Sequence, residues 1–347
     1  MSELDSSDPR PPRRARYRGT HPRRFEERYK ELDPARFPRE VEKVRARGHT
    51  PAGTHVPVLL AEVLEVLRPA PGGVILDCTL GHGGHAAALA QRVLPGGRAI
   101  GIDADAEELE RTRARLAAQG LPVAAHQGNF AGALQVLAAE GLEVVDIVLA
   151  DLGVSSMQLD RPERGFSWKH DGPLDMRMDR ARGVSAAEWL RSASEEQLRA
   201  ALESWGEDPD AAAVAAVIKA QPPASTGELL RLILQAKRLD PGAVKRRRRG
   251  DGHPAARTFQ ALRMAVNREI PNLEHLLRIL PRLLRPGGRA AILSFHSGED
   301  RRVKQAFARG RAAGVYAAGG GPVPPSPAEV AANPRARSAR LRWAERA

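Results

Sequence analysis

The fold of this 347-residue chain is decided by one stretch, Val74-Ile-Leu-Asp-Cys-Thr-Leu-Gly-His-Gly-Gly-His-Ala86. A short apolar run, typical of a buried strand, passes directly into a glycine cluster and then into a helical pattern. Gly81, Gly83 and Ala86 occupy the three small positions of the pattern G-x-G-x-x-G/A, in which glycines let the backbone turn sharply and approach a ligand closely. The stretch therefore predicts a strand, a loop and a helix of the kind that bind nucleoside-containing cofactors.

Strands and helices alternate around that stretch. An amphipathic helical pattern covers residues 58–67 before it. Further strands are predicted at 98–103, 122–126 and 144–152, and they alternate with helical patterns at 86–93, 106–119 and 130–139. Strands that alternate with helices of this length are typical of a parallel sheet covered by helices on both faces. The sequence thus predicts the α/β fold class.

The alternation stops near residue 170 and resumes near residue 255. In between, four short helical patterns, several opening at Ser, Thr or Asp caps, are predicted at 185–190, 195–205, 210–219 and 226–237. Afterwards come helices at 256–269 and 273–284, a strand at 289–295 and an edge strand at 338–343. We therefore predict an α/β domain over residues 55–168 and 255–347, interrupted by an all-helical, substrate-recognising domain over residues 169–254.

Composition narrows the class of protein. Fifty-four Lys and Arg against 42 Asp and Glu give a net charge of +12, which suggests a polyanionic partner. No run approaches the ~18–20 consecutive apolar residues that span a bilayer, so we expect no membrane association. The single cysteine, Cys78, excludes an intrachain disulfide and a metal site built on several cysteines. We expect a cytoplasmic protein without a metal, whose residues 1–54 form a basic, mobile arm.

Three side chains at the ends of predicted strands are candidates for contacting the cofactor. Asp103 ends its strand 20 residues after Gly83, where a carboxylate can accept hydrogen bonds from ribose hydroxyls. Phe130 follows the next strand and can lie against an adenine ring. Asp151 ends the strand over 144–152, and ligands of open α/β sheets bind beyond such carboxyl ends. These residues fit either a dinucleotide, with its pyrophosphate at a helix N-terminus, or S-adenosylmethionine.

Residues 55 to about 310, with segment 333–338, resemble the bacterial 16S rRNA cytosine-N4 methyltransferase family. The matching segments, in the same order, are His55–Glu62, Gly81–His85, Asp151–Asp160, Arg164–Ser167, Asp171–Asp179, Ser185–Leu190, His253–Ala261 and Ser294–Arg301. The resemblance implies a class I (Rossmann-like) S-adenosylmethionine-dependent methyltransferase fold with an inserted all-helical domain. It also implies methyl transfer to N4 of one cytidine of 16S rRNA, cytosine 1402 in the standard rRNA numbering. Another RNA amino-methyltransferase and an NAD-dependent oxidoreductase remain alternatives.

The resemblance also implies roles for individual residues. By position, Gly83, Gly84 and His85 contact the methionine end of S-adenosylmethionine, Asp103 the ribose and Phe130 the adenine region, while Asp151 and Gln158 close the site.

As the acceptor for a proton of the attacking amine we predict Asp151 or a backbone carbonyl near Leu152–Val154. His296, at the end of a strand, is a second catalytic candidate, or a residue that caps the sheet. Methylation at cytosine C5 needs a cysteine nucleophile, and Cys78 lies in the cofactor turn instead.

The implied partner is 16S rRNA or the small ribosomal subunit, and a homodimer is compatible with the sequence. The basic run Lys245–Arg249 is a candidate for contacting RNA phosphates, although such runs are often only solvated loops. The candidate RNA-binding residues are Lys245, Arg246, Arg247, Arg257, Arg263, Asn267 and Arg301.

Overall fold

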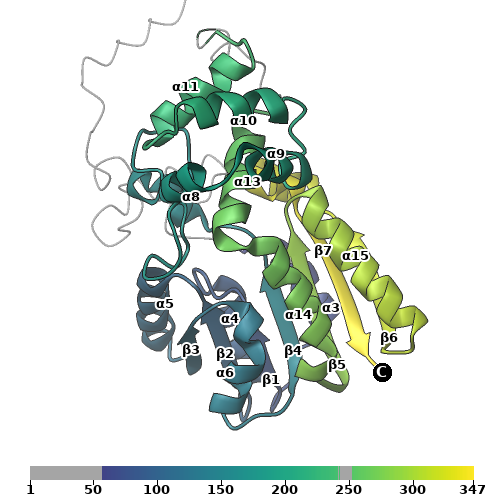
Figure 1. Cartoon of the computed structure of the whole chain (residues 1–347). Coiled ribbons are helices and arrows are strands. Elements are labelled where there is room, and N and C mark those ends of the chain that lie inside the picture. Colours follow the sequence, from purple (N-terminus) through teal and green to yellow (C-terminus); the bar gives the residue numbers. More distant parts are fainter. Residues whose placement is uncertain (1–56, 241, 243–251) are drawn as a thin grey trace, which may run out of the picture. The chain divides into compact units, whose positions relative to one another are not determined.

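A computed structural model describes residues 57–240, 242 and 252–347, which all belong to one compact unit. Its centre is a seven-stranded sheet with the order β3-β2-β1-β4-β5-β7-β6 (Figure 1). The strands are β1 (Val74–Asp77), β2 (Arg98–Asp103), β3 (Val123–Gln127), β4 (Val145–Asp151), β5 (Leu284–Ser294), β6 (Tyr316–Val323) and β7 (Arg340–Arg346). The predicted α/β class is confirmed.

Helices cover both faces of the sheet, because alternate strand residues point to opposite sides and both sides are apolar. Ile75 and Leu149 belong to a core cluster with helices α3 (Leu60–Leu67) and α4 (Gly84–Val93). Leu76 and Val148 belong to the cluster of the opposite face. The helices of that face are α6 (Ala133–Ala139), α14 (Glu269–Leu283) and α15 (Ser297–Ala312), whereas α5 (Ala106–Ala118) packs beside α4. This three-layer arrangement leaves the carboxyl ends of β1, β2 and β4 at one edge.

Between β4 and β5 the described chain is helical. The elements are α7 (Ser156–Asp160), the 3₁₀ turn η3 (Pro162–Arg164), α8 (Ala186–Ser192), α9 (Glu195–Ser204), α10 (Ala211–Ala220), α11 (Thr226–Ala236) and α13 (Ala256–Asn267). Helices α8, α9 and α11 each begin at a serine capping box, at Ser185, Ser194 and Ser225. They share one hydrophobic cluster with Phe166 and with Phe259 of α13. The division into domains at residues 168/169 and 254/255 stays a prediction, and this cluster extends across both boundaries.

The sequence prediction was wrong at the C-terminal end of the sheet. The last strand, β7, is no edge strand, because it lies between β5 and β6 and is antiparallel to both. The edge strand β6 was not predicted, since its Gly319-Gly-Gly-Pro322 segment is poor in strand-forming residues. Helix α15 was also missed, because Val303 and Phe307 are its only buried large apolar side chains. None of the described helices is long and apolar enough to cross a membrane.

Candidate active site

The glycine loop between β1 and α4 requires glycine for two physical reasons. Gly83 has a left-handed φ of 74°, and a Cβ there would lie only 2.7 Å from Cγ2 of Thr112. A Cβ on Gly84 would lie 2.5 Å from Cγ of Pro57. From α5, the Thr112 hydroxyl donates to the carbonyl of Gly81 over 2.6 Å. The loop is thus tightly seated, with its backbone held from α5 and no room for a side chain at Gly83 or Gly84.

Two carboxylates stand next to this loop, at the ends of β1 and β2. Asp103 accepts the N–H of Gly81 at 2.6 Å and the N–H of Asp105 at 2.8 Å, so it ties the loop to the end of β2. Burial raises the pKa of Asp103 to about 6. Asp77 is only 1% exposed, and burial, with a smaller contribution from the charge of Asp103, raises its pKa to about 7. This edge of the sheet therefore favours a positively charged ligand.

Asp151 completes the edge at the end of β4. Its backbone N–H donates to the Thr79 hydroxyl over 2.6 Å, and its side chain is 27% exposed. Oδ1 of Asp151 is buried and has no hydrogen-bond partner within the described residues. Burial, together with the charges of Asp77 and Glu299, raises the pKa of Asp151 to about 8. A carboxylate in this setting has an oxygen whose capacity to accept a hydrogen bond is unused, and it is sensitive to any positive charge placed beside it.

His85 connects Asp151 to the segment before α3. Its Nε2 lies 3.0 Å from the carbonyl oxygen of Val58, and its Nδ1 lies 3.6 Å from Oδ2 of Asp151. Because a carbonyl only accepts, Nε2 carries a hydrogen, and Nδ1 is the ring nitrogen that faces Asp151. A proton on either Nδ1 or Oδ2 can join the two side chains.

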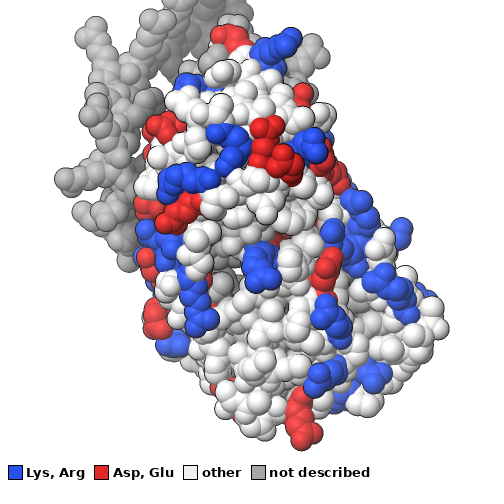
Figure 2. All heavy atoms as spheres, viewed as in Figure 1, with Lys and Arg blue, Asp and Glu red and all other residues white. Residues whose placement is uncertain are grey.

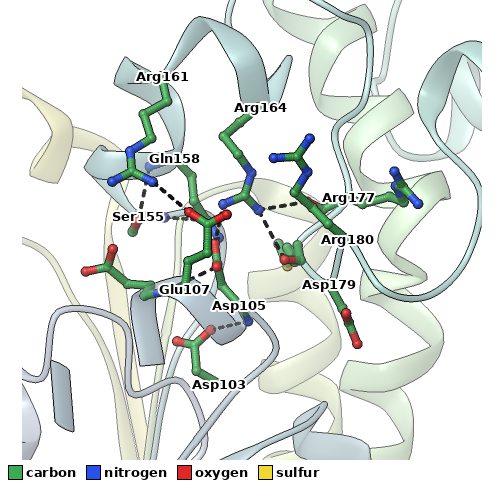
Figure 3. A network of polar contacts seen from close by, with 12 residues as sticks. Asp103, Asp105, Glu107, Ser155, Gln158, Arg161, Arg164, Arg177, Asp179 and Arg180 are labelled. Atoms are coloured by element: carbon green, nitrogen blue, oxygen red, sulfur yellow. Dashed lines mark hydrogen bonds and ion pairs between the residues drawn. The ribbon is translucent and has the colours of Figure 1, made fainter. Parts of the chain in front are cut away.

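A buried polar network supports the edge from the side of the helical segment (Figure 3). The guanidinium of Arg164, 2% exposed, donates to Oδ2 of Asp105 over 2.5 Å and to the carbonyls of Arg177 and Met178. The side-chain amide of Gln158 donates to the same Oδ2 over 2.9 Å. Asp105 thus contacts two predicted cofactor residues, Gln158 through its carboxylate, which Arg164 neutralises, and Asp103 through its backbone N–H.

Phe130 and His296 lie where secondary structure begins. Phe130 opens the 3₁₀ turn η2 (Phe130–Gly132) and packs, partly buried, against the core. His296 caps α15, because its Nδ1 accepts the N–H of Glu299, and its Nε2 lies 3.1 Å from the Glu299 carboxylate. Burial acts to raise the pKa of Glu299, but His296, Arg263 and the N–H of Phe295 together hold it below its ordinary value. Of the two roles predicted for His296, the geometry agrees with capping, but the element that it caps is helix α15 and not the sheet.

The predicted RNA-binding residues mostly pair within the chain. Arg263 forms two hydrogen bonds of 2.8 Å with Glu269, and Asn267 binds the backbone of Met176 and Met178. Arg257 donates to the carbonyl of Glu207, and Arg301 to its carboxylate over 2.9 Å. Lys245, Arg246 and Arg247 lie outside the described residues, as does the predicted arm over 1–54. A direct contact of these residues with RNA stays a prediction.

Sequence reasoning missed Asp77, Asp105 and Arg164 as parts of the site. Asp105 was detectable, because an aspartate directly before a helical pattern is a typical N-cap. Arg164 belongs to a motif quoted above, but its partner lies 59 residues earlier in the chain and no local pattern reveals it. Among the described residues no group of three or more His, Cys, Asp or Glu side chains could hold a metal ion.

Comparison with known proteins identifies the family. The sequence model of the MraW methylase family matches residues 52–347. The chain belongs to this family. It is 42% identical to "Ribosomal RNA small subunit methyltransferase H 2" of Alkaliphilus metalliredigens, over 99% of this chain and 100% of that protein. It is 47% identical to "Ribosomal RNA small subunit methyltransferase H" of Sorangium cellulosum, over 84% of this chain and 90% of that protein.

The family assignment settles the kind of enzyme. The chain is a methylase that uses S-adenosylmethionine, so the alternative of an NAD-dependent oxidoreductase is not supported. The alignment with the Alkaliphilus relative extends into residues 1–54, about which the family resemblance had been silent. Among solved structures, a putative rRNA-methylase of Clostridium thermocellum matches with a TM-score of 0.41 at 12% identity, over 84% of this chain and 100% of that one. The sequence relatives, and not this likeness, carry the assignment.

Proposed function

We propose that this methylase transfers a methyl group from S-adenosylmethionine to the exocyclic N4 of one cytidine in 16S rRNA, cytosine 1402 in the standard numbering. Two relatives, from Alkaliphilus and Sorangium, are named as small-subunit rRNA methyltransferases. The observation that carries the proposal is the unpartnered Oδ1 of Asp151 at the end of β4. It provides an acceptor for an amine hydrogen next to the glycine loop.

The residues of the sheet edge fit the donor. Gly83, Gly84 and His85 receive the methionine end, since their loop is bonded to Asp103 through Gly81 and faces Asp151 through His85. Asp103 accepts the ribose hydroxyls with lone pairs that its two backbone contacts leave over, and Phe130 lies against the adenine. Gln158 closes the site, and Asp105 fixes its position by accepting a hydrogen bond from its side-chain amide. When bound, S-adenosylmethionine supplies a methyl group on a positively charged sulfur, which the carboxylates of Asp77, Asp103 and Asp151 attract.

Asp151 then acts on the attacking amine. The N4 lone pair is delocalised into the cytosine ring, and a hydrogen bond from N4–H to Oδ1 helps this nitrogen to pyramidalise and attack. The new bond joins N4 to the methyl carbon, the carbon–sulfur bond breaks with its electron pair on sulfur, and one N4 proton leaves towards Asp151. Because a direct displacement needs three aligned atoms, positioning supplies most of the acceleration, about 7–11 kcal/mol in favourable cases.

The target base reaches this edge only when it is unstacked from its neighbours, which costs a few kcal/mol. We propose the helical segment 169–254 as the part that recognises the surrounding RNA, since it follows the site directly along the chain. A homodimer and a cytoplasmic location stay predictions.

The proposal is tested by mapping the product. The purified protein is incubated with methyl-labelled S-adenosylmethionine and small ribosomal subunits from a strain that lacks the gene. We expect the label in N4-methylated cytidine at a single position of 16S rRNA, with Asp151→Asn as the impaired control. Label on cytosine C5, on a ribose oxygen or on no nucleoside at all contradicts the proposed reaction.

A further inference from the structure

The charge of the chain is distributed unevenly between its two long described ranges. Residues 57–240 contain 18 Lys and Arg and 26 Asp and Glu, a net charge of −8. Residues 252–347 contain 17 Lys and Arg and only 6 Asp and Glu, a net charge of +11. The positive charge that suggests a polyanionic partner therefore gathers, within the described residues, on α13, α14, α15 and the strands β5 to β7.

Helices α14 and α15 carry a large part of this charge. They contain seven Lys and Arg and four Asp and Glu. All four acids are engaged inside the chain: Glu269 with Arg263, Glu274 with Arg302, Glu299 with His296, and Asp300 with Arg342. Figure 2 shows the resulting surface, with many Lys and Arg and few Asp and Glu side chains over these two helices. What remains at the surface is strongly basic.

The two helices enclose a groove of about 500 Å³. Arg278 of α14 and Arg302 and Arg309 of α15 line it, together with Gln305 and a single acid, Glu274. Arg302 is fixed by a 2.9 Å contact with Glu274 and a 2.9 Å bond to the carbonyl of Gly298. Arg278 and Arg309 are exposed and form no ion pair within the described residues. Their charges are thus available to an external anion.

The helix that forms one side of the groove starts near the end of β4 that carries Asp151. Helix α15 begins three residues after β5, which pairs with β4 so that Leu293 lies beside Asp151. From there α15 runs for 16 residues, about 24 Å of helix. A polymer whose target base lies at Asp151 can therefore place several neighbouring phosphates along α15.

We propose that the groove between α14 and α15, with Arg278 and Arg309 as its free cations, binds the sugar–phosphate backbone of the rRNA beside the target cytidine. The inference rests on the proposed function for the identity of the RNA. It assigns RNA contact to residues other than Arg263 and Asn267, whose side chains are occupied within the chain. A polyanion can contact the separate guanidinium groups of the two helices at once, which a single small anion cannot do.

The test is a variant in which Arg278 and Arg309 are both changed to Gln, a good helix former at exposed positions. The matched control changes Arg111 and Arg199 to Gln; these are exposed by 48 and 52% and lie on α5 and α9. Dissociation constants for unmethylated small ribosomal subunits are measured against salt concentration. We expect the groove variant to bind about tenfold or more weakly at ~100 mM salt, with a salt slope reduced by about 2, whereas the control keeps the wild-type slope.

Binding of S-adenosylmethionine is measured on the same proteins and is expected to be unchanged, which shows that the groove variant is folded. An unchanged salt slope in the groove variant, or an equal loss in the control, overturns the proposal. So does a loss confined to binding of phosphatidylglycerol vesicles, since the surface would then serve a membrane. If the wild-type protein binds the subunits through the groove but methylates no cytidine, the proposed function fails and the binding surface stands.

Discussion

The two long described ranges carry opposite net charges, and each is opposite in sign to the ligand that we propose for it, the positively charged donor or the polyanionic RNA. Residues 57–240, with a net charge of −8, carry Asp77, Asp103 and Asp151 at the sheet edge, where a positively charged donor is to bind. Residues 252–347, with a net charge of +11, carry the basic groove, where a polyanion is to bind. The net charge of the whole chain, +12, hides this division. Charge is thus informative for each part of the fold separately.

The two regions also differ in where their decisive charges lie. Those of the acidic region are largely buried, and Asp105 and Arg164 have side chains exposed by only 5 and 2%. Those of the basic groove are mostly exposed. Removing one partner of a buried ion pair leaves the other charge buried and uncompensated, whereas water solvates the groups that remain when an exposed charge is removed. The same kind of substitution should therefore have very different effects in the two regions.

The largest effect is expected for Arg164→Met. The variant leaves Asp105 buried without its cation, so we expect a loss of about 3–5 kcal/mol in the free energy of unfolding. Arg278→Met in the groove is the matched control and should change that free energy by less than about 0.5 kcal/mol. Denaturant unfolding measures the free energy of unfolding of both variants. Equal losses would show that the buried and the exposed charge do not differ in their contribution to stability.

The next largest effect is expected for Asp151→Asn. The amide keeps the size of the side chain but accepts a proton poorly, so kcat/KM for rRNA methylation should fall by about 10²–10³-fold. Stability of the protein alone should not fall, because the substitution mimics the protonated carboxyl that the site favours. Full turnover with unaltered donor affinity would exclude Asp151 from the reaction.

A smaller effect is expected from pH. The pKa values of Asp77, Asp103 and Asp151, raised to about 7, 6 and 8, lie above the 3.8 of the unfolded chain, so the unfolded state loses these protons first. Stability of the protein alone should therefore decrease as pH rises from about 4 to 8. Donor affinity should increase, by up to about tenfold per pH unit between pH 6 and 8, because the positive donor requires the ionised carboxylates. Calorimetric titration of S-adenosylmethionine measures this, and a flat profile in the wild type speaks against the carboxylate edge.

The smallest effect is expected at Cys78, inside the acidic region. The side chain is 2% exposed, and burial raises the pKa of its thiol, so it should be inert to alkylating reagents in the folded protein. Cys78→Ala should retain methylation within about threefold, since transfer to a nitrogen needs no cysteine nucleophile. Loss of all activity with wild-type stability would point back to chemistry at a ring carbon.

The parts of the fold that could be predicted are those whose structure is determined by residues close together in the sequence. The buried apolar runs of β1, β2 and β4 and the glycines at 81 and 83 are such patterns, and they located Asp103 and Asp151 correctly at strand ends. Helix α15 escaped prediction, because it is exposed over most of its surface and its pattern is dominated by charge. The contact between Arg164 and Asp105 escaped as well, since it forms only when the chain folds back on itself.

One pair of binding measurements tests most directly whether the donor and the RNA occupy oppositely charged regions. Affinities for S-adenosylmethionine and for unmethylated small ribosomal subunits are determined for Asp151→Asn and for the variant with Arg278 and Arg309 changed to Gln. We predict that the first variant loses donor affinity and keeps subunit affinity, and that the second loses subunit affinity and keeps donor affinity. Equal losses of both ligands in either variant, or the opposite assignment, would contradict the account.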